Sequence, residues 1–157
     1  MTARRVYLAV IAALLVIIAS LVYKFVVAGS TAAGDDGRIA VVLAPGERAF
    51  MLHEMRGFVA GVAQLTDALA RNDMPAAAAA AANMGAARAH DVPLAMLGKL
   101  PIGFKELAFG VHRGFDTMAA DARQLADRDH TLGQLAGLLG QCTACHERYQ
   151  IGAAAPR

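Results

Sequence analysis

The chain has 157 residues, of which 57% are hydrophobic and 18% are charged, and its formal net charge is +2. These totals indicate one compact domain together with a membrane-like segment. Apart from Arg4, Arg5 and Lys24, the chain has 12 Lys and Arg against 13 Asp and Glu, which argues against a nucleic acid as partner.

The N-terminal segment has the length and composition of a membrane-spanning helix. Val6–Tyr23 covers 18 residues with Ser20 as the only polar side chain, and would span about 27 Å as a helix. Because Arg4 and Arg5 precede this run, the positive-inside rule places the N-terminus in the cytoplasm and the rest in the periplasm of a Gram-negative cell. A cleaved signal peptide is the alternative. The apolar run exceeds the usual signal core, so we expect an uncleaved single-pass anchor in the inner membrane over residues 1–28.

Residues 29–44 are expected to form a linker. Up to residue 38 they are small and polar, as in a flexible tether, whereas residues 39–44, IAVVLA, are an apolar run too short to decide between strand and helix. Pro45 then opens a helical pattern that continues to about Arg71, with apolar residues at alternating spacings of four and three. The soluble domain is therefore expected to occupy residues 45–157.

Three further helices are predicted. Asp73 is a suitable N-cap for an alanine-rich second helix, and a third begins at about Pro101 after a connection rich in proline and glycine. Thr131 is the expected N-cap of the last helix. A predicted stripe at spacings of three and four in that helix contains Leu132, Leu135, Leu139, Cys142, His146 and Tyr149. Four helices with short connections predict an all-α antiparallel four-helix bundle, a fold that binds cofactors between facing helices.

The last predicted helix carries the most specific motif of the chain, Cys142-Thr143-Ala144-Cys145-His146. Two thiols three residues apart, followed directly by an imidazole, form the C-x-x-C-H pattern of covalent haem attachment. On a helix, positions i, i+3 and i+4 share one face, so Cys142, Cys145 and His146 would meet the same porphyrin. Each sulfur would form a thioether, and the imidazole would take one axial position on the iron. Because these residues fall on the predicted core stripe, the haem is expected to lie inside the bundle.

Three other interpretations of the cysteine pair are available. Zinc usually has four ligands from paired clusters, and the chain has neither a second Cys pair nor a closely spaced His pair. Redox-active C-x-x-C dithiols lie at a helix N-terminus after a strand, whereas this pair falls about ten residues into a helical run. The third interpretation is a merely structural pair of buried cysteines. The export signal favours haem, because attachment to C-x-x-C-H occurs on the exported side.

The soluble domain resembles the cytochrome c′ family, the class II c-type cytochromes, including their low-spin four-helix-bundle relatives. The resemblance covers nearly all of residues 45–150. It rests on the four helices, on C-x-x-C-H near the C-terminus, and on the aromatic Tyr149 three residues after it. Arg48, Leu52 and Met55 also match an R-x-x-x-[ML]-x-x-M pattern on the first helix of the family. The resemblance implies one covalent haem c per chain, with Tyr149 close to it, and pairing of two chains in a homodimer.

The resemblance also concerns the distal side of the iron. The position of Leu52 faces the iron in the family, where a Met gives a six-coordinate electron carrier and an apolar residue leaves the iron five-coordinate. Met55 lies one turn away on the same face and Met51 is adjacent, so either thioether is an alternative ligand, and we prefer Met55. Arg48 is a candidate partner for a haem propionate, with plain surface charge as the alternative.

Other polar residues near the motif carry weaker signals. Relatives commonly have a basic residue four positions after the haem histidine, where this chain has Gln150, and Arg148 lies only two positions after it. His53 and His112 would allow a bis-histidine haem, but each is expected to be solvated or otherwise satisfied.

The first functional expectation is a membrane-tethered, periplasm-facing c-type cytochrome. It would carry single electrons to or from redox partner proteins in or at the membrane, with His146 proximal and Met55 distal. The alternative, implied by the high-spin relatives, is a five-coordinate haem protein that binds nitric oxide or another diatomic gas. A thiol oxidoreductase without haem is a third interpretation. The domain has almost no serine from which to assemble a nucleophile and its base, so an enzyme is not expected.

Overall fold

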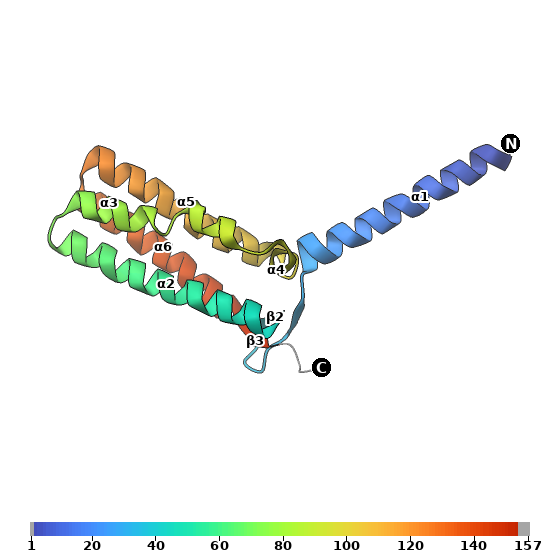
Figure 1. The fold of residues 1–157 in the computed structure, drawn as a ribbon, viewed down its shortest axis with the longest axis horizontal. Coiled ribbons are helices and arrows are strands. Elements are labelled where there is room, and N and C mark those ends of the chain that lie inside the picture. Colours follow the sequence, from blue (N-terminus) through green and yellow to red (C-terminus); the bar gives the residue numbers. More distant parts are fainter. Residues whose placement is uncertain (1, 154–157) are drawn as a thin grey trace.

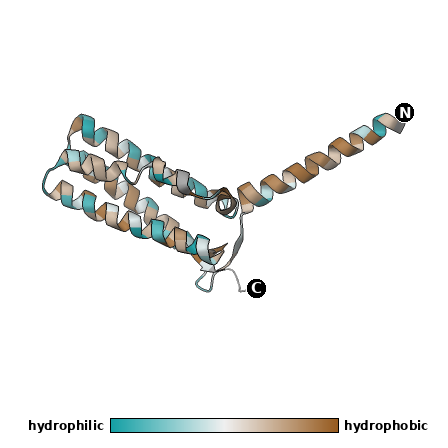
Figure 2. Cartoon of the chain, viewed as in Figure 1, coloured by the Kyte–Doolittle hydropathy of each residue, from teal (hydrophilic) through white to brown (hydrophobic). Residues whose placement is uncertain are grey.

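A long apolar helix extends from the rest of the molecule in the computed structural model, which describes residues 2–153 (Figure 1). Helix α1 (Thr2–Val22) continues into a wider π-helical turn, η1 (Tyr23–Ala28). Within the described residues, Ala3–Ala28 is the one helix long and apolar enough to cross a membrane, with 26 residues. Figure 2 shows that it is hydrophobic along almost its whole length. The predicted length and composition are confirmed, and an N-terminal signal sequence would share both properties.

A small sheet follows this helix. Strand β1 (Thr31–Ala33) pairs antiparallel with β2 (Ile39–Leu43), and β2 pairs parallel with β3 (Tyr149–Ala153). The all-α expectation is wrong at these residues, and the segment treated as a linker contains two of the three strands. The β-branched residues of β2 favour a strand, and its partner β3 is more than a hundred residues away in the sequence, so no local period could reveal the pairing.

Helices make up most of the chain between the second and third strands. Their bounds are α2 (Pro45–Ala70), α3 (Met74–Ala82), the 3-10 helix η2 (Ala86–Asp91), α4 (Leu94–Leu97), α5 (Ile102–Leu125) and α6 (Arg128–Arg148). Asp73 caps α3 as predicted, because its carboxylate accepts a backbone N–H of the first turn at 3.0 Å. However, α3 is shorter than its alanine-rich sequence predicted. After the turn at Gly85, the N–H of Ala86 bonds to the Asp116 carboxylate at 3.0 Å instead of continuing the helix.

Helix α6 begins earlier than the sequence predicted. Asp127 is the N-cap, and its carboxylate accepts the N–H groups of Asp129 and His130 at 2.9 and 3.0 Å. Thr131, the expected cap, is fully buried inside the first turn, where its hydroxyl donates to the carbonyl of Asp127 at 2.8 Å. Aspartate and threonine are both good caps, and the more N-terminal one is used here.

The long helices pack side by side, with α3 between α2 and α5 and with α6 against α5 (Figure 1). Small residues make these contacts close, because backbones separated only by alanine or glycine can approach each other. The alanines of α3 supply most of them. A Cβ added at Gly61 of α2 would collide with Met84, and one at Gly114 of α5 would collide with Leu138 of α6.

Buried side chains form two clusters. The helix cluster lies among α2, α3, α5 and α6, and includes Leu65, Leu69, Met84, Phe115, Met118, Leu138 and the alanines of α3. The sheet-end cluster lies where the sheet, α4 and the start of α5 meet. It consists of Val41, Leu43, Met51, Met96, Leu100, Phe104 and Tyr149. The C-terminal turns of α6 lie beside both clusters, so the cysteine motif falls where they meet.

Candidate functional site

Cys142, Cys145 and His146 occupy the last two turns of α6, and the buried stripe of this helix differs from the predicted one. The side chains that α6 turns toward the clusters are Thr131, Leu135, Leu138, Cys142, Cys145 and, just after its end, Tyr149. Leu132 and Leu139 are each 41% exposed, and His146 is exposed. The two thiols therefore face the core as predicted, whereas the histidine lies at the edge of the buried stripe.

Both thiols are half-buried and unpaired. Cys142 packs against the helix cluster and Cys145 against the sheet-end cluster. Burial raises the pKa of both thiols above the ordinary value, and the neighbouring Cys142 raises that of Cys145 further. Redox-active dithiols need a lowered pKa, which a helix N-terminus provides, and this pair lies far from the N-terminus of α6. These thiols are therefore neutral near pH 7, which disfavours a thiol-disulfide active site.

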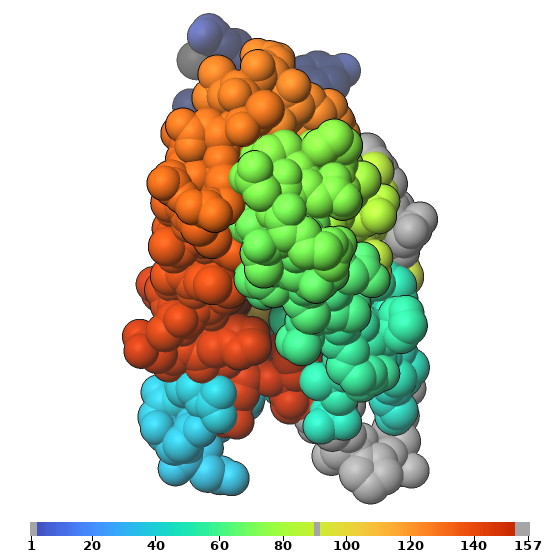
Figure 3. All heavy atoms as spheres, turned by 90° about the vertical axis from the view of Figure 1, so that its left-hand side faces the viewer, coloured from blue at the N-terminus to red at the C-terminus, as the bar shows by residue number. Residues whose placement is uncertain are grey.

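One side of α6 is occupied by α5. Gln134 donates its amide to Asp121 at 2.6 Å, and Leu138 packs against Gly114. The opposite side of α6 faces away from α5 and carries residues two turns apart, which share a face. They are Leu132, Leu139 and His146, all exposed. In the end-on view of Figure 3, the red C-terminal part of the chain lies beside the teal beginning of α2.

One side of helix α2 packs against α3 and the 3-10 helix η2 that follows it. Glu54 binds Arg88 through two hydrogen bonds of 3.1 Å, and a Cβ at Gly57 would also meet Arg88. The other side of α2 carries Arg48, Leu52, Met55 and Val59, of which Val59 is 72% exposed. We call these four residues, together with Leu132, Leu139, Cys142 and His146, the α2–α6 side. It contains exposed apolar residues on both helices and an exposed imidazole on α6.

The two candidate methionines differ in position. Met55 is half-buried and packs against the sheet-end cluster, as Cys145 does. Met51 is only 7% exposed and belongs to that cluster itself. Leu52 is half-buried and lies further around α2, toward solvent. Met55 is therefore the thioether at the border between the core and the α2–α6 side.

Tyr149 ends the helix and begins the sheet. It is 5% exposed, packs edge-on against Phe104 with 5.4 Å between ring centroids, and lies below the Arg148 guanidinium at 5.5 Å. The predicted helical stripe is wrong here, because Tyr149 is the first residue of β3 and pairs with Ile39. Its ring is held by the start of α5, next to Gly103.

Arg38 is a residue near the motif that the sequence did not reveal. Its guanidinium donates to the carbonyl of His146 at 3.2 Å and to the Gln150 side chain at 3.5 Å, and pairs with Asp36 at 2.6 Å. This pairing lowers the pKa of Asp36. A basic group thus lies at the C-terminus of α6, where it suits the helix dipole. Only the pairing of β2 with β3 brings it there, so no local sequence signal identifies it.

His53, His112 and His130 lie apart from the α2–α6 side or have other partners. His112 has Nδ1 at 2.9 Å from the carbonyl of Met84, and its ring packs at a tilt of 49° against Phe58, with 5.1 Å between centroids. His130 binds Asp121 at 3.2 Å, and His53 is exposed on α2. Among the side chains that the structure describes, those of residues 3–89 and 92–152, no three His, Cys, Asp or Glu are placed to hold a metal ion by themselves.

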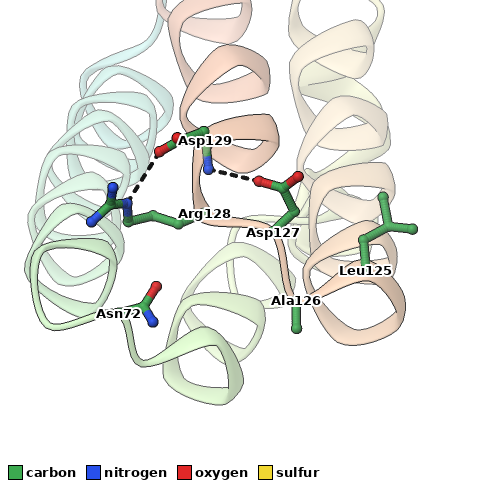
Figure 4. Close-up of a pocket in the computed structure, with 6 residues that line it drawn as sticks. All are labelled: Asn72, Leu125, Ala126, Asp127, Arg128 and Asp129. Carbon is green, nitrogen blue, oxygen red and sulfur yellow. Dashed lines mark hydrogen bonds and ion pairs between the residues drawn. The ribbon is translucent and has the colours of Figure 1, made fainter.

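A surface pocket lies at the start of α6, whereas the cysteine motif lies at the end of that helix; Figure 4 shows the pocket. It is open to solvent, and its lining consists of Asn72, Leu125, Ala126, Asp127, Arg128 and Asp129. Its polar groups bond to one another, as Arg128 does with Asp129 at 3.2 Å. Comparison with known proteins gives no match to a family model, a curated protein or a solved structure. Function must therefore be inferred from the chemistry of the motif and its surroundings.

Proposed function

We propose that this protein is a membrane-tethered c-type cytochrome that carries single electrons. Cys142 and Cys145 would hold one haem c through thioethers, and His146 would be an axial ligand. The observation that carries the proposal is the arrangement of the motif on α6: two neutral, half-buried thiols face the core, and the imidazole is exposed beside apolar residues. A covalently attached porphyrin would use this combination, because the two thiols would form its thioethers and the exposed imidazole would ligate its iron.

The residues around the motif fit a porphyrin. Leu139 and Val59 are large, apolar and exposed on the α2–α6 side, where a flat apolar group between α2 and α6 would cover them. In this proposal, α2, α3 with η2, α5 and α6 form an antiparallel four-helix bundle whose α2–α6 side holds the haem. The haem would supply a one-electron iron couple, and the chain would supply its ligands, its burial and its electrostatic surroundings.

Met55 is the proposed distal ligand. It lies on the α2–α6 side and packs against the same cluster as Cys145, whereas the alternative, Met51, is buried in that cluster. Arg48 is exposed at the start of α2 on the same side, where a haem propionate would find a positive partner. Tyr149 would contact the haem from the end of α6.

The same proposal gives the protein a location and partners. Helix α1 would cross the inner membrane once, with Arg4 and Arg5 on the cytoplasmic side and the helical domain in the periplasm. Electrons would pass to and from redox proteins in or at the membrane, and two copies would pair as a homodimer. The chain would act as a carrier without catalysing a reaction of its own.

Absorption spectra test this proposal. The protein is produced with the cytochrome c maturation system, and oxidised and reduced spectra are recorded for wild type, Met55→Ala and Met51→Ala. We expect a low-spin spectrum with a sharp reduced α band that is lost only in Met55→Ala. Colourless but folded protein would contradict haem binding itself, with Cys142→Ala/Cys145→Ala as the matched haem-free control.

A second candidate function has one observation in its favour. Leu52 is apolar and half-buried on the α2–α6 side, so it would cap a distal position left without a protein ligand. A broad high-spin spectrum, unchanged by either methionine substitution, would favour a five-coordinate haem that binds nitric oxide or a similar gas. Rapid binding of nitric oxide to the wild-type protein would then distinguish gas binding from electron transfer.

A further inference from the structure

The end of the membrane helix is bound to the helical domain at a defined place. Lys105 of α5 donates its ammonium to the carbonyls of Phe25 and Val26 at 3.0 and 3.2 Å, which are left open at the end of η1. The Ser30 N–H donates to the carbonyl of Lys99 at 2.7 Å. Gly29, which lies between η1 and Ser30 in the sequence, is buried and has φ of +66°. A Cβ at this position would lie 2.7 Å from the nitrogen of Pro101. The start of α5 therefore lies directly beside the point where the chain enters the membrane.

Large apolar side chains are exposed beside this junction. Leu94, on the short helix α4, is 82% exposed, the highest value among the large hydrophobic residues outside the membrane helix. Ile102, the first residue of α5, is 38% exposed. The segment between them lies against η1, since a Cβ added at Gly98 would touch Phe25, and Figure 1 shows α4 next to the end of the long apolar helix.

The charges around these residues suit a lipid surface. Lys24, Lys99 and Lys105 lie at the junction, and burial lowers the pKa of Lys105 without removing its role as a donor. Glu47 neutralises Lys99 in an ion pair of 2.6 Å, and Glu106 is exposed nearby in the sequence. Basic side chains flanking exposed apolar ones are typical of segments that lie in the membrane interface.

We propose that α4 and the start of α5 rest on the bilayer that α1 crosses, with Leu94 and Ile102 inserted at the boundary between headgroups and acyl chains. Continuity with the membrane helix selects the bilayer as the occupant, because a surface fixed beside η1 cannot avoid the headgroup region. This assignment does not depend on haem. Met96 and Leu100 of the same segment belong to the sheet-end cluster, against which Cys145 packs, so the cysteine end of the domain faces the membrane. Its consequence rests on the proposed function: electrons would be exchanged with a partner inside the membrane.

Tryptophan fluorescence tests the proposal, because the chain contains no tryptophan. Full-length Leu94→Trp and the control Leu125→Trp are placed in vesicles with and without brominated acyl chains. Leu125 is 57% exposed at the opposite end of α5, so neither substitution disturbs the core. We expect brominated lipid to remove about half of the tryptophan emission of Leu94→Trp and almost none of that of Leu125→Trp, at a depth typical of interfacial segments.

Two results would overturn this assignment. Equal, weak quenching of the two variants would show that α4 lies in water. Blue-shifted but unquenched emission of Leu94→Trp would show that a protein surface, either a second copy or another partner, covers α4 instead. Both tryptophan variants are also measured in the haem-free Cys142→Ala/Cys145→Ala background, because energy transfer to haem shortens the tryptophan lifetime and would weaken bromine quenching, and absorption of the samples reports haem separately. Failure of this assignment is therefore distinguishable from failure of the proposed function.

Discussion

Single residues at the junction with the apolar helix α1 fix how the two parts of the chain meet. Gly29 adopts φ of +66° and ψ of −153°, a region open essentially to glycine alone, and it does so while buried against the backbone before α5. Nothing in the small, polar composition of this segment distinguishes Gly29 from a glycine of a flexible tether. Its role depends on its tight packing against the backbone of residues 99–101, which are distant in the sequence.

We expect Gly29→Ala to destabilise the junction by about 2 kcal/mol, because the new methyl group adds a steric clash to a strained backbone. The loss would appear as faster tryptic cleavage after Arg38 in detergent-solubilised protein. Gly46→Ala is the matched control, since a Cβ at that position in the first turn of α2 meets no atom within 4 Å. Equal cleavage rates for the two variants and wild type would contradict the prediction.

The partly buried ion pair between Glu54 and Arg88 offers a second prediction for single residues. The Glu54 side chain is 17% exposed and forms two hydrogen bonds with the guanidinium, whereas Asp67, paired with Arg71 on the same helix, is 65% exposed. Because a partly buried, bidentate ion pair is stronger than an exposed one, we expect Glu54→Gln to lower the free energy of unfolding by about 1 to 2 kcal/mol. Asp67→Asn should cost less than about 0.5 kcal/mol. Denaturant unfolding of both variants measures the difference, and the reverse order would count against it.

At the scale of elements, the start of α2 is tied to the connection before α5. The Glu47 carboxylate accepts the N–H of Ala44 at 2.8 Å and binds the Lys99 ammonium at 2.6 Å. The hydrogen bonds from Lys99 lower the pKa of Glu47 below its ordinary value near 4.5. A carboxyl whose pKa is lowered by folding stabilises the protein fully above its unfolded pKa, and this contribution is lost as pH falls through the folded pKa.

We therefore expect Glu47→Gln to lower stability by about 0.5 to 1 kcal/mol at pH 7, because the amide keeps the bond to Ala44 but loses the ion pair. This would lower the melting temperature by about 2 to 4 °C, measured by circular dichroism. The difference from wild type should shrink as pH falls below about 4.5 and disappear once the carboxyl is protonated in both states. A difference that persists at low pH would point to packing in place of the ion pair.

Elements also show how far the sequence could be interpreted. Pro45 and Asp73 were sufficient to place the starts of α2 and α3, because caps act within a few residues. The stripe of α6 could not be placed, since two apolar stripes pass through Leu135 and Cys142. One includes Leu139 and His146, and the other includes Leu138 and Cys145. Choosing between them requires knowing that α5 lies against Leu138, which is information from the tertiary structure. The same holds for β3, whose partner is distant in the sequence.

For the whole molecule, the sheet and the junction place the cysteine motif at the end of the helices that lies nearest to the apolar helix α1. Strand β2 pairs with β3, which directly follows α6. Helix α5 binds η1 through Lys105, and the residue before it, Phe104, packs on Tyr149. The motif itself was recognisable from five consecutive residues. Its surroundings were not: Arg38 and the exposure of His146 follow from how distant segments meet, and the role of Met55 as iron ligand stays a prediction.

A porphyrin between α2 and α6 would make the stability of the molecule depend on residues that are exposed without it. Val59 is 72% exposed, so Val59→Ser should change stability by less than about 0.5 kcal/mol in the haem-free variant Cys142→Ala/Cys145→Ala. With haem attached, the same substitution removes buried apolar surface and should cost about 1 kcal/mol or more. Thermal melts of the four proteins form a double-mutant cycle, whose coupling measures the contact directly. Leu125→Ser, at the far end of α5, should show no coupling. Absence of coupling for Val59 as well would place the haem on another face of α6, because only a group lying against α2 can distinguish these two exposed residues.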